Sequence, residues 1–247
     1  MEIEDAVALV TGANRGLGKA YVEALLGRGA ARIYAGARDP STLAPVVALD
    51  PRRIVPVVLD VTREGDAARA AVSSSDVTLL INNAGVFANF GGFVMRPDNA
   101  AIRHEMEVNY FGVLALCQAF APVLAHNGGG AIVNVLSILA TIATPVTGSY
   151  CASKFAALAM TRCLRAELAL QRTLVVAAMP GTIDTDMAKD YAGPKVSPGE
   201  AAAATLDAVV AGDEEIYIGD QARGLAARHR ADPEAVAREH ARFLPMA

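Results

Sequence analysis

The 247-residue sequence is poor in cysteine and offers no cluster of metal ligands. Its three cysteines, Cys117, Cys151 and Cys163, are odd in number and have no CxxC spacing, which argues against a disulfide framework and against a zinc site. The four histidines fall outside every recognisable motif and also lack metal-ligand spacing. We therefore expect no metal, and we interpret the cysteines as small core residues.

The sequence also lacks a strong charge of one sign and a long uninterrupted apolar run. The net charge is −4 and there is no basic stripe, so nothing provides an electrostatic footprint for nucleic acid. The first residues, MEIEDAVALVTG, carry acids where a secretory signal carries bases. The apolar stretches near 113–124 and 131–146 are interrupted by polar residues and proline. We predict a cytoplasmic protein that binds a small ligand and neither nucleic acid nor a membrane.

Short apolar runs rich in Val and Ile alternate with longer helical patterns along the whole chain. Such runs are typical of strands buried on both faces of a parallel sheet. Strands are expected near 6–12, 32–37, 54–61, 77–85, 131–137, 173–181 and 215–220, and helices near 17–28, 64–73, 100–126, 150–171 and 198–211. No linker interrupts the alternation, so we predict one α/β domain over residues 1–247. It would hold a Rossmann-type, doubly wound parallel sheet of about seven strands with helices on both faces. The tail, about 221–247, is charged and helical in part, and its packing is not evident from the sequence.

The stretch TGANRGLG, residues 11–18, joins the first strand to the first helix. Glycines at 12, 16 and 18 allow a tight turn and a close approach to a pyrophosphate, and the helix N-terminus adds free N–H groups and partial positive charge. A P-loop is excluded because Gly18-Lys19 is followed by Ala20 and lies one residue too far from Gly12. The usual GxGxxG spacing is also absent; the glycines follow GxxxGxG.

The end of the second strand, AGARD, indicates which dinucleotide the turn would hold. An NAD site commonly sets a carboxylate here, whereas a 2′-phosphate needs a cation. This chain has Arg38, and Arg15 lies in the glycine turn, so two guanidiniums can converge on a phosphate. Asp39 lies one residue after the position from which such a carboxylate binds the adenosine ribose. Arg38 taken alone reads as a surface residue, but its position favours NADP(H).

Polar residues follow the third and fourth strands, where ligands bind in such sheets. Asp60 in LDVT is placed to meet an adenine amino group. Asn82 and Asn83 in INNAG have two readings that the sequence leaves open, because Asn also serves turns and ties strand ends together.

Tyr150 and Lys154, in SYCASK, are four residues apart at the start of a predicted helix. On a helix they share one face, and an ammonium close to a phenol lowers the phenol pKa towards working pH. Ser137, at the end of the fifth strand, can steady a carbonyl oxygen beside Tyr150. The set predicts a proton donor and acceptor.

These motifs, in this order, resemble the short-chain dehydrogenase/reductase family. The resemblance runs from Thr11 to about Thr185 and includes TGANRGLG, DV at 60–61, NNAG at 82–85, Asn109 in VNYFG, Ser137, YCASK and PGTIDT at 180–185. It departs from the family where Leu136 replaces a serine of the fifth strand, and where the short segment between Asp60 and Asn82 trims a helix.

The resemblance implies roles for individual residues. Tyr150 would be the general acid in carbonyl reduction, Lys154 would hold the nicotinamide ribose, Ser137 would orient the substrate oxygen, and Asn109 would support a water that links Lys154 to solvent. The cofactor would be bound by Gly12, Asn14, Arg15, Gly16, Leu17, Gly18, Arg38, Asp60, Val61, Asn83, Ala84, Gly85, Tyr150, Lys154, Pro180, Gly181, Ile183 and Thr185.

The sequence thus predicts an NADPH-dependent oxidoreductase that reduces a ketone or aldehyde. A non-catalytic NADP-binding sensor or scaffold on the same fold, and an epimerase or dehydratase of the same family, are the alternatives. A segment at about 184–197 would cover the substrate, with Leu139, Met187 and Tyr191 as largely apolar walls, so we expect a small apolar carbonyl or alcohol as substrate. Ala-rich helices at 100–126 and 150–171 suit a homodimer or homotetramer.

Overall fold

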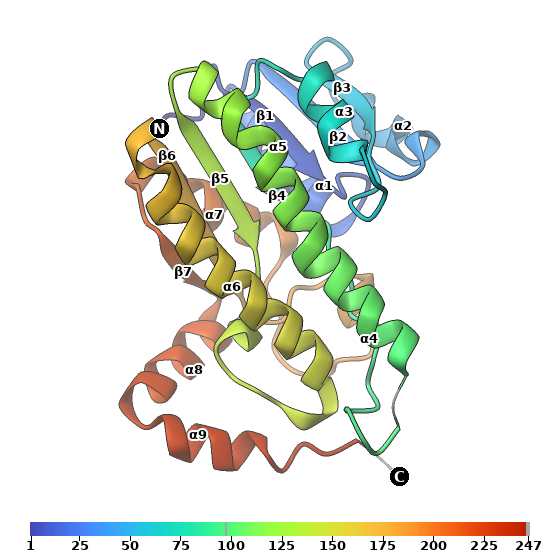
Figure 1. Ribbon diagram of the computed structural model, residues 1–247, viewed down its shortest axis with the longest axis vertical. Coiled ribbons are helices and arrows are strands. Elements are labelled where there is room, and N and C mark those ends of the chain that lie inside the picture. The colour runs from blue at the N-terminus through green and yellow to red at the C-terminus, as the bar shows by residue number, and fades with distance from the viewer. Residues whose placement is uncertain (97, 246–247) are drawn as a thin grey trace.

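The computed structural model describes residues 1–96 and 98–245, in which seven parallel strands form one sheet. Their order is β3-β2-β1-β4-β5-β6-β7 (Figure 1). The direction of winding therefore reverses between β1 and β4, which is where such sheets bind ligands. The strands are β1 (Val7–Thr11), β2 (Arg32–Ala37), β3 (Ile54–Val58), β4 (Leu79–Asn82), β5 (Gly130–Val135), β6 (Thr173–Pro180) and β7 (Glu215–Ile218). The predicted α/β fold class is confirmed.

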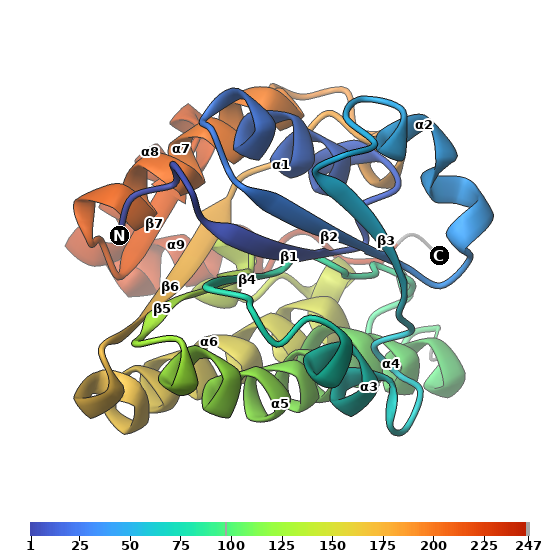
Figure 2. The ribbon, with the colours of Figure 1, turned by 90° about the horizontal axis from the view of Figure 1, so that it is seen from above.

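Helices cover both faces of this sheet, as Figure 2 shows from above. Helices α1 (Gly16–Gly27), α2 (Ala44–Val47) and α7 (Pro198–Ala211) lie over one face. Helices α3 (Asp66–Ser73), α4 (Asn99–Met106), α5 (Val113–His126) and α6 (Gly148–Leu168) lie over the other. Each face has its own apolar cluster, the first around Tyr21 and Leu25 and the second around Phe120 and Leu124. The central strands are near-continuously apolar because both faces are buried.

The long helix expected over 100–126 is interrupted. Between α4 and α5 the segment Glu107–Gly112 forms a π-helical turn. Such turns are rare and occur often at functional sites, and this one carries Asn109, whose side chain is fully buried. By length and composition the run Asn99–His126 could cross a membrane; in the fold it packs against the sheet and α6.

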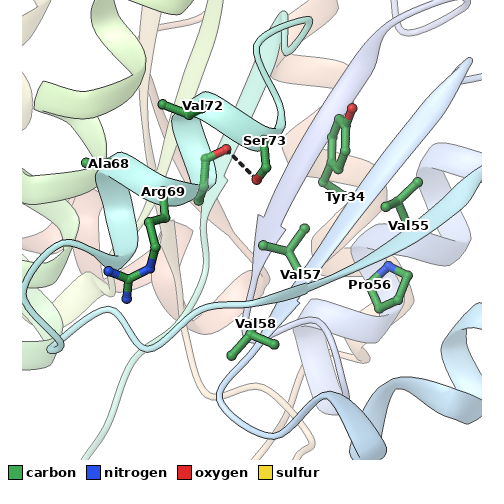
Figure 3. A pocket seen from close by; sticks show the side chains of 10 residues that line it. Tyr34, Val55, Pro56, Val57, Val58, Ala68, Arg69, Val72 and Ser73 are labelled. Carbon is green, nitrogen blue, oxygen red and sulfur yellow. Dashed lines mark hydrogen bonds between the residues drawn. The ribbon is translucent and has the colours of Figure 1, made fainter.

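Strand β3 differs from its prediction as a strand buried on both faces. It forms one edge of the sheet, and Val55, Pro56 and Val58 are exposed. The cause is the short α3, only eight residues long, which leaves an open groove of about 700 Å³ between itself and β3 (Figure 3). Proline at this position is compatible with an edge strand because it cannot donate a ladder hydrogen bond.

The charged tail forms α8 (Asp220–Ala231) and α9 (Pro233–His240). Ala222, Ala226 and Val236 of these helices pack against Ile138 and Ile142, which follow β5. The Thr144 hydroxyl lies 2.9 Å from His240 Nδ1, and the Val146 amide donates to the Phe243 carbonyl at 3.0 Å. The tail therefore packs against, and hydrogen-bonds to, the segment between β5 and α6.

Candidate active site

The predicted site residues gather at the carboxyl edge of the sheet. They follow β1, β2, β3, β4, β5 and β6, and because these strands are parallel their ends lie along one edge. The sheet therefore brings together polar and glycine residues that are far apart in the sequence.

The glycine turn after β1 leaves room for a phosphate. Gly12 and Gly16 have φ of +63° and +52°, in the left-handed region that favours glycine. A Cβ added at Gly18 would lie 2.0 Å from the Gly12 carbonyl oxygen. Helix α1 begins at Gly16, and its N-cap residue, Arg15, makes no side-chain capping bond. The first N–H groups of α1 thus remain available to an anion, so this cradle fits the pyrophosphate of a dinucleotide.

Asn83 fastens this turn to the end of β4. Its side-chain amide donates to the Thr11 carbonyl at 2.8 Å, and the backbone N–H groups of Asn83 and Ala84 donate to the Thr11 hydroxyl, each at 2.9 Å. Asn82 instead donates to the Asn134 side chain at 2.8 Å. Both asparagines therefore tie neighbouring strand ends together.

Charged side chains surround the expected adenosine end of the cradle. Asp60 accepts hydrogen bonds from the Thr62 amide and hydroxyl at 3.0 and 2.8 Å. Burial alone would raise the Asp60 pKa, but these bonds and the charges of Arg38 and His104 hold it below its ordinary value. Among the described residues Arg38 makes no ion pair, whereas Arg15 pairs with Asp186 at 2.8 Å. Arg38 is thus the freer of the two guanidiniums predicted to meet a 2′-phosphate.

The segment after β6 lies over the glycine turn. A Cβ at Gly16 would lie 3.2 Å from Thr185 Cγ2, and the Gly181 amide donates to the Ile218 carbonyl at 3.0 Å. Ile183 and Val196 form an isolated parallel bridge that closes the base of the segment. Residues 184–195 therefore form a loop anchored beside the phosphate cradle.

Tyr150 lies in the first turn of α6, with Lys154 one turn further along. The Lys154 ammonium is buried, lies 5.6 Å from the centre of the Tyr150 ring, and donates to the Val135 carbonyl at 2.9 Å. Ser137 follows β5 and is also buried. A hydrogen bond with Ser137 favours the phenolate form of Tyr150. The geometry places a phenol, an ammonium and a hydroxyl together.

The predicted lowering of the Tyr150 pKa by Lys154 is not what this structure shows. Burial raises the pKa of Tyr150, and the hydrogen bond with Ser137 only partly offsets this. Burial also lowers the pKa of Lys154 to about 8. The reason is that the ammonium points to a backbone carbonyl rather than to the phenol oxygen.

Asn109 and Gly85 adjoin this group. A Cβ at Gly85 would lie 3.3 Å from Asn109 Oδ1 and 3.6 Å from Lys154 Nζ. The Asn109 amide donates to the Val86 carbonyl at 2.9 Å and to the Ser153 hydroxyl at 3.0 Å, and its oxygen accepts from the Val86 amide at 2.9 Å. Asn109 thus joins the turn after β4 to α6.

The three residues predicted to line the substrate pocket lie in different surroundings. Leu139 packs against the apolar cluster of the tail, and Met187 and Tyr191 are 51% and 41% exposed. The aromatic ring next to Tyr150 is that of Phe87, with ring centres 5.0 Å apart, and Phe90 lies 4.1 Å beyond it. The sequence analysis missed this wall. Its only signal was the phenylalanine-rich stretch VFANFGGF directly after NNAG.

The comparisons with known proteins agree with this geometry. The family model of the short chain dehydrogenases matches residues 6–195. A short-chain dehydrogenase from Burkholderia cenocepacia J2315, solved in complex with NADP, is 48% identical, with a TM-score of 0.92, 97% of this chain covered and 99% of that one.

Two curated relatives are more distant and longer. The short chain dehydrogenase pigC of Monascus ruber is 31% identical and the dehydrogenase/reductase SDR family member 7B of Danio rerio is 34% identical, each over 75% of this chain. The matches span 65% and 63% of the lengths of those two proteins. From the extent of the family match and the shared fold, the chain belongs to the short-chain dehydrogenase/reductase family.

Proposed function

We propose that the protein is an NADPH-dependent oxidoreductase that reduces a ketone or aldehyde to an alcohol, in a reversible reaction. The observation that carries the proposal is the grouping of Tyr150, Lys154 and Ser137 on the sheet edge that also bears the phosphate cradle. A proton donor and a dinucleotide cradle on one edge are what reduction of a carbonyl requires.

The residues divide the work as follows. When bound, the reduced nicotinamide supplies the hydride that the carbonyl carbon accepts. Ser137 donates a hydrogen bond to the carbonyl oxygen, and Tyr150 transfers its phenolic proton to that oxygen as the alcohol forms. Lys154 would hold the nicotinamide ribose, and Asn109 holds the turn after β4 beside Lys154. Reprotonation from solvent completes the cycle.

The preference for NADP(H) rests on Arg38 and Arg15. Arg38 follows β2 without an ion-pair partner among the described residues, and a planar guanidinium suits a 2′-phosphate. The Burkholderia relative bound to NADP supports the same choice. On cofactor binding, Arg15 would break its ion pair with Asp186 and pair with the 2′-phosphate instead.

The substrate would be a small apolar carbonyl compound or alcohol. Phe87 beside Tyr150, and Phe90 next to Phe87, offer an apolar aromatic wall, and Phe90 is 59% exposed in this structure. Apolar and aromatic linings are usual in small-molecule sites.

The test is NADPH oxidation by the purified protein with acetophenone, cyclohexanone, benzaldehyde and phenanthrenequinone, repeated on Tyr150→Phe. Wild type should turn over at least one of these, and the variant should lose about a thousandfold in kcat while NADPH binding, followed by its fluorescence, stays unchanged. NADPH binding without any turnover would instead support a sensor or scaffold. Release of an isomerised or dehydrated product would indicate an epimerase or dehydratase.

We also propose a cytoplasmic homodimer or homotetramer. Phe111 on the π-helical turn and Phe155 on α6 are 48% and 41% exposed, on the helices that the sequence predicts to pack between subunits. Light scattering on the purified protein gives the mass that tests this, and a monomer at micromolar concentration would contradict it.

A further inference from the structure

Glu105, in the last turn of α4, is a buried carboxylate outside the residues so far assigned to the reaction. Its side chain is fully buried. One oxygen, Oε1, accepts the backbone N–H groups of Ala88 at 2.7 Å and Asn89 at 3.1 Å. The other, Oε2, is buried and finds no hydrogen-bond partner among the described residues. Glu105 also forms no ion pair with any described lysine, arginine or histidine.

The residues that Glu105 holds belong to the segment Val86–Asn89, which carries Phe87 against the Tyr150 ring. This segment is bound from two sides. On one side Asn109 binds Val86 and Glu105 binds Ala88 and Asn89.

The other side of the segment faces the first two turns of α6. The Asn89 amide donates to the Ser149 hydroxyl at 3.1 Å, and Ser149 directly precedes Tyr150. One turn further along, the Ser153 hydroxyl accepts from Asn109 at 3.0 Å. Polar side chains thus connect the segment 86–89 and α6 twice, once through Glu105 of α4 and Asn89, and once through Asn109 of the π-helical turn.

A charged carboxylate is unfavourable at the buried position of Glu105. An isolated buried charge without a cation is unfavourable in proteins, and a neutral glutamine oxygen could accept the same two N–H groups. Buried charges that lack compensation are found where a site uses them. The candidate use lies close by: burial is the main cause of the raised pKa of Tyr150, and the charge of Glu105 adds to it.

We propose that Glu105 is a positioning residue of the active site, which holds the segment Val86–Asn89 and its Phe87 ring against Tyr150 and acts on the phenol through its charge. The inference rests on the proposed role of Tyr150 and adds to it. The titratable groups around the Tyr150 phenol are Lys154 and Cys151 on its own helix and Glu105 on α4. Glu105 is the acidic member of this set.

Glu105→Gln separates the charge from the hydrogen bonds. The amide oxygen can still accept from Ala88 and Asn89, and the NH₂ group replaces the unpartnered oxygen. Without the negative charge the Tyr150 pKa falls, so the pH profile of alcohol oxidation, which needs the phenolate, should move to lower pH by about half a unit or more. The alkaline limb of ketone reduction should move in the same direction. The substrate is the panel compound that wild type reduces fastest, together with its alcohol.

Glu105→Leu removes the hydrogen bonds as well. We expect amide hydrogen exchange at Ala88 and Asn89 to quicken by about tenfold, and the KM for the carbonyl compound to rise more than kcat falls. Glu105→Gln should leave exchange at these amides within about threefold of wild type. Glu107→Gln is the matched control, because Glu107 is an exposed acid two residues along the same chain segment, and it should change neither measurement.

Two outcomes overturn the proposal: an unchanged pH profile in Glu105→Gln, or exchange at Ala88 and Asn89 that is as slow in Glu105→Leu as in wild type. If Glu105→Leu does not fold, Glu105→Gln decides alone. The exchange measurement needs no turnover, so it gives a result even where no panel compound is reduced and the proposed function itself has failed.

Discussion

The phosphate cradle after β1 and the proton-transfer group at the start of α6 are built in opposite ways. The cradle is made of backbone: left-handed glycines, a close approach of Gly18 to Gly12, and the free N-terminus of α1. The proton-transfer group, Tyr150, Lys154 and Ser137, is made of polar side chains, of which Lys154 and Ser137 are buried. Substitutions that add side-chain volume should therefore disturb the cradle most, and substitutions that change side-chain charge should disturb the proton-transfer group most.

Gly18→Ala gives the largest expected effect on the cradle. The added methyl would meet the Gly12 carbonyl oxygen at 2.0 Å, so the turn must open and lose the shape that receives a pyrophosphate. We expect NADPH affinity to fall at least about a hundredfold, or roughly 3 kcal/mol. Fluorescence titration with NADPH measures this, with circular dichroism to show that the variant is folded.

Gly27→Ala is the control for that substitution. Gly27 ends the same helix, and a Cβ there would meet no atom of the described residues within 4 Å. It should leave NADPH affinity unchanged and gain up to about 1 kcal/mol of stability from helix propensity. Equal affinities in both variants would mean that the cradle is not the cofactor site.

The cradle could be predicted from the sequence because its determinants are local. The glycines of a tight turn between a strand and a helix are visible in the eight residues TGANRGLG, and in the structure two of them have positive φ. The strands could be predicted for the same reason. The exposure of β3 could not, because it depends on how far the short α3 reaches across the sheet.

Lys154→Met tests the cost of charge in the proton-transfer group. Burial lowers the Lys154 pKa from its ordinary 10.5 to about 8. Between these two values the unfolded chain binds a proton that the folded chain has lost, so wild-type stability rises with pH through this window. Below pH 8 both states carry the charge, and wild type bears the full cost of its burial.

We therefore expect Lys154→Met to be more stable than wild type at pH 7, by up to about 3 kcal/mol at about 1.4 kcal/mol per pH unit. This difference in unfolding free energy should shrink as pH rises from 8 towards 10. Urea unfolding across this range measures it. Lys189→Met, at an exposed position of the loop after β6, should show no such trend, and a parallel trend in both variants would exclude Lys154 as its source.

The proton-transfer group was only partly predictable. Tyr150, Lys154 and Ser137 stand out in the sequence by spacing, but Glu105 and Phe87 do not, because their importance arises from contacts across α4, α6 and the turn after β4. The direction of the Tyr150 pKa was wrong for the same reason. Spacing on a helix brings the ammonium near the ring, whereas the position of the Val135 carbonyl decides where the ammonium points.

Arg38→Asp probes a place where cofactor binding depends on a charged side chain. With a carboxylate after β2, we expect NADPH affinity to fall about tenfold to a hundredfold, as one good charge-assisted contact is lost and a repulsion is gained. NADH affinity should change less than threefold. Parallel titrations with both cofactors measure the ratio. Arg52→Asp makes the same charge change at an exposed residue before β3. If it lowers NADPH affinity equally, the Arg38→Asp effect arises from the net charge of the protein and not from a contact with the 2′-phosphate.

Asp186→Asn gives the smallest expected effect and asks whether the loop after β6 competes with the cofactor for Arg15. The Arg15–Asp186 pair is mostly exposed, at 72% and 77% of the two side chains, so it contributes at most about 1 kcal/mol. Freeing Arg15 should tighten NADPH binding by no more than about fivefold, and this gain should shrink at high salt because the charges are screened. Asp190→Asn, at an exposed acid of the same loop, should have no effect. If NADH binding tightens as much as NADPH binding, the ion pair acts by holding the loop over the cradle and not by occupying the guanidinium that a 2′-phosphate would use.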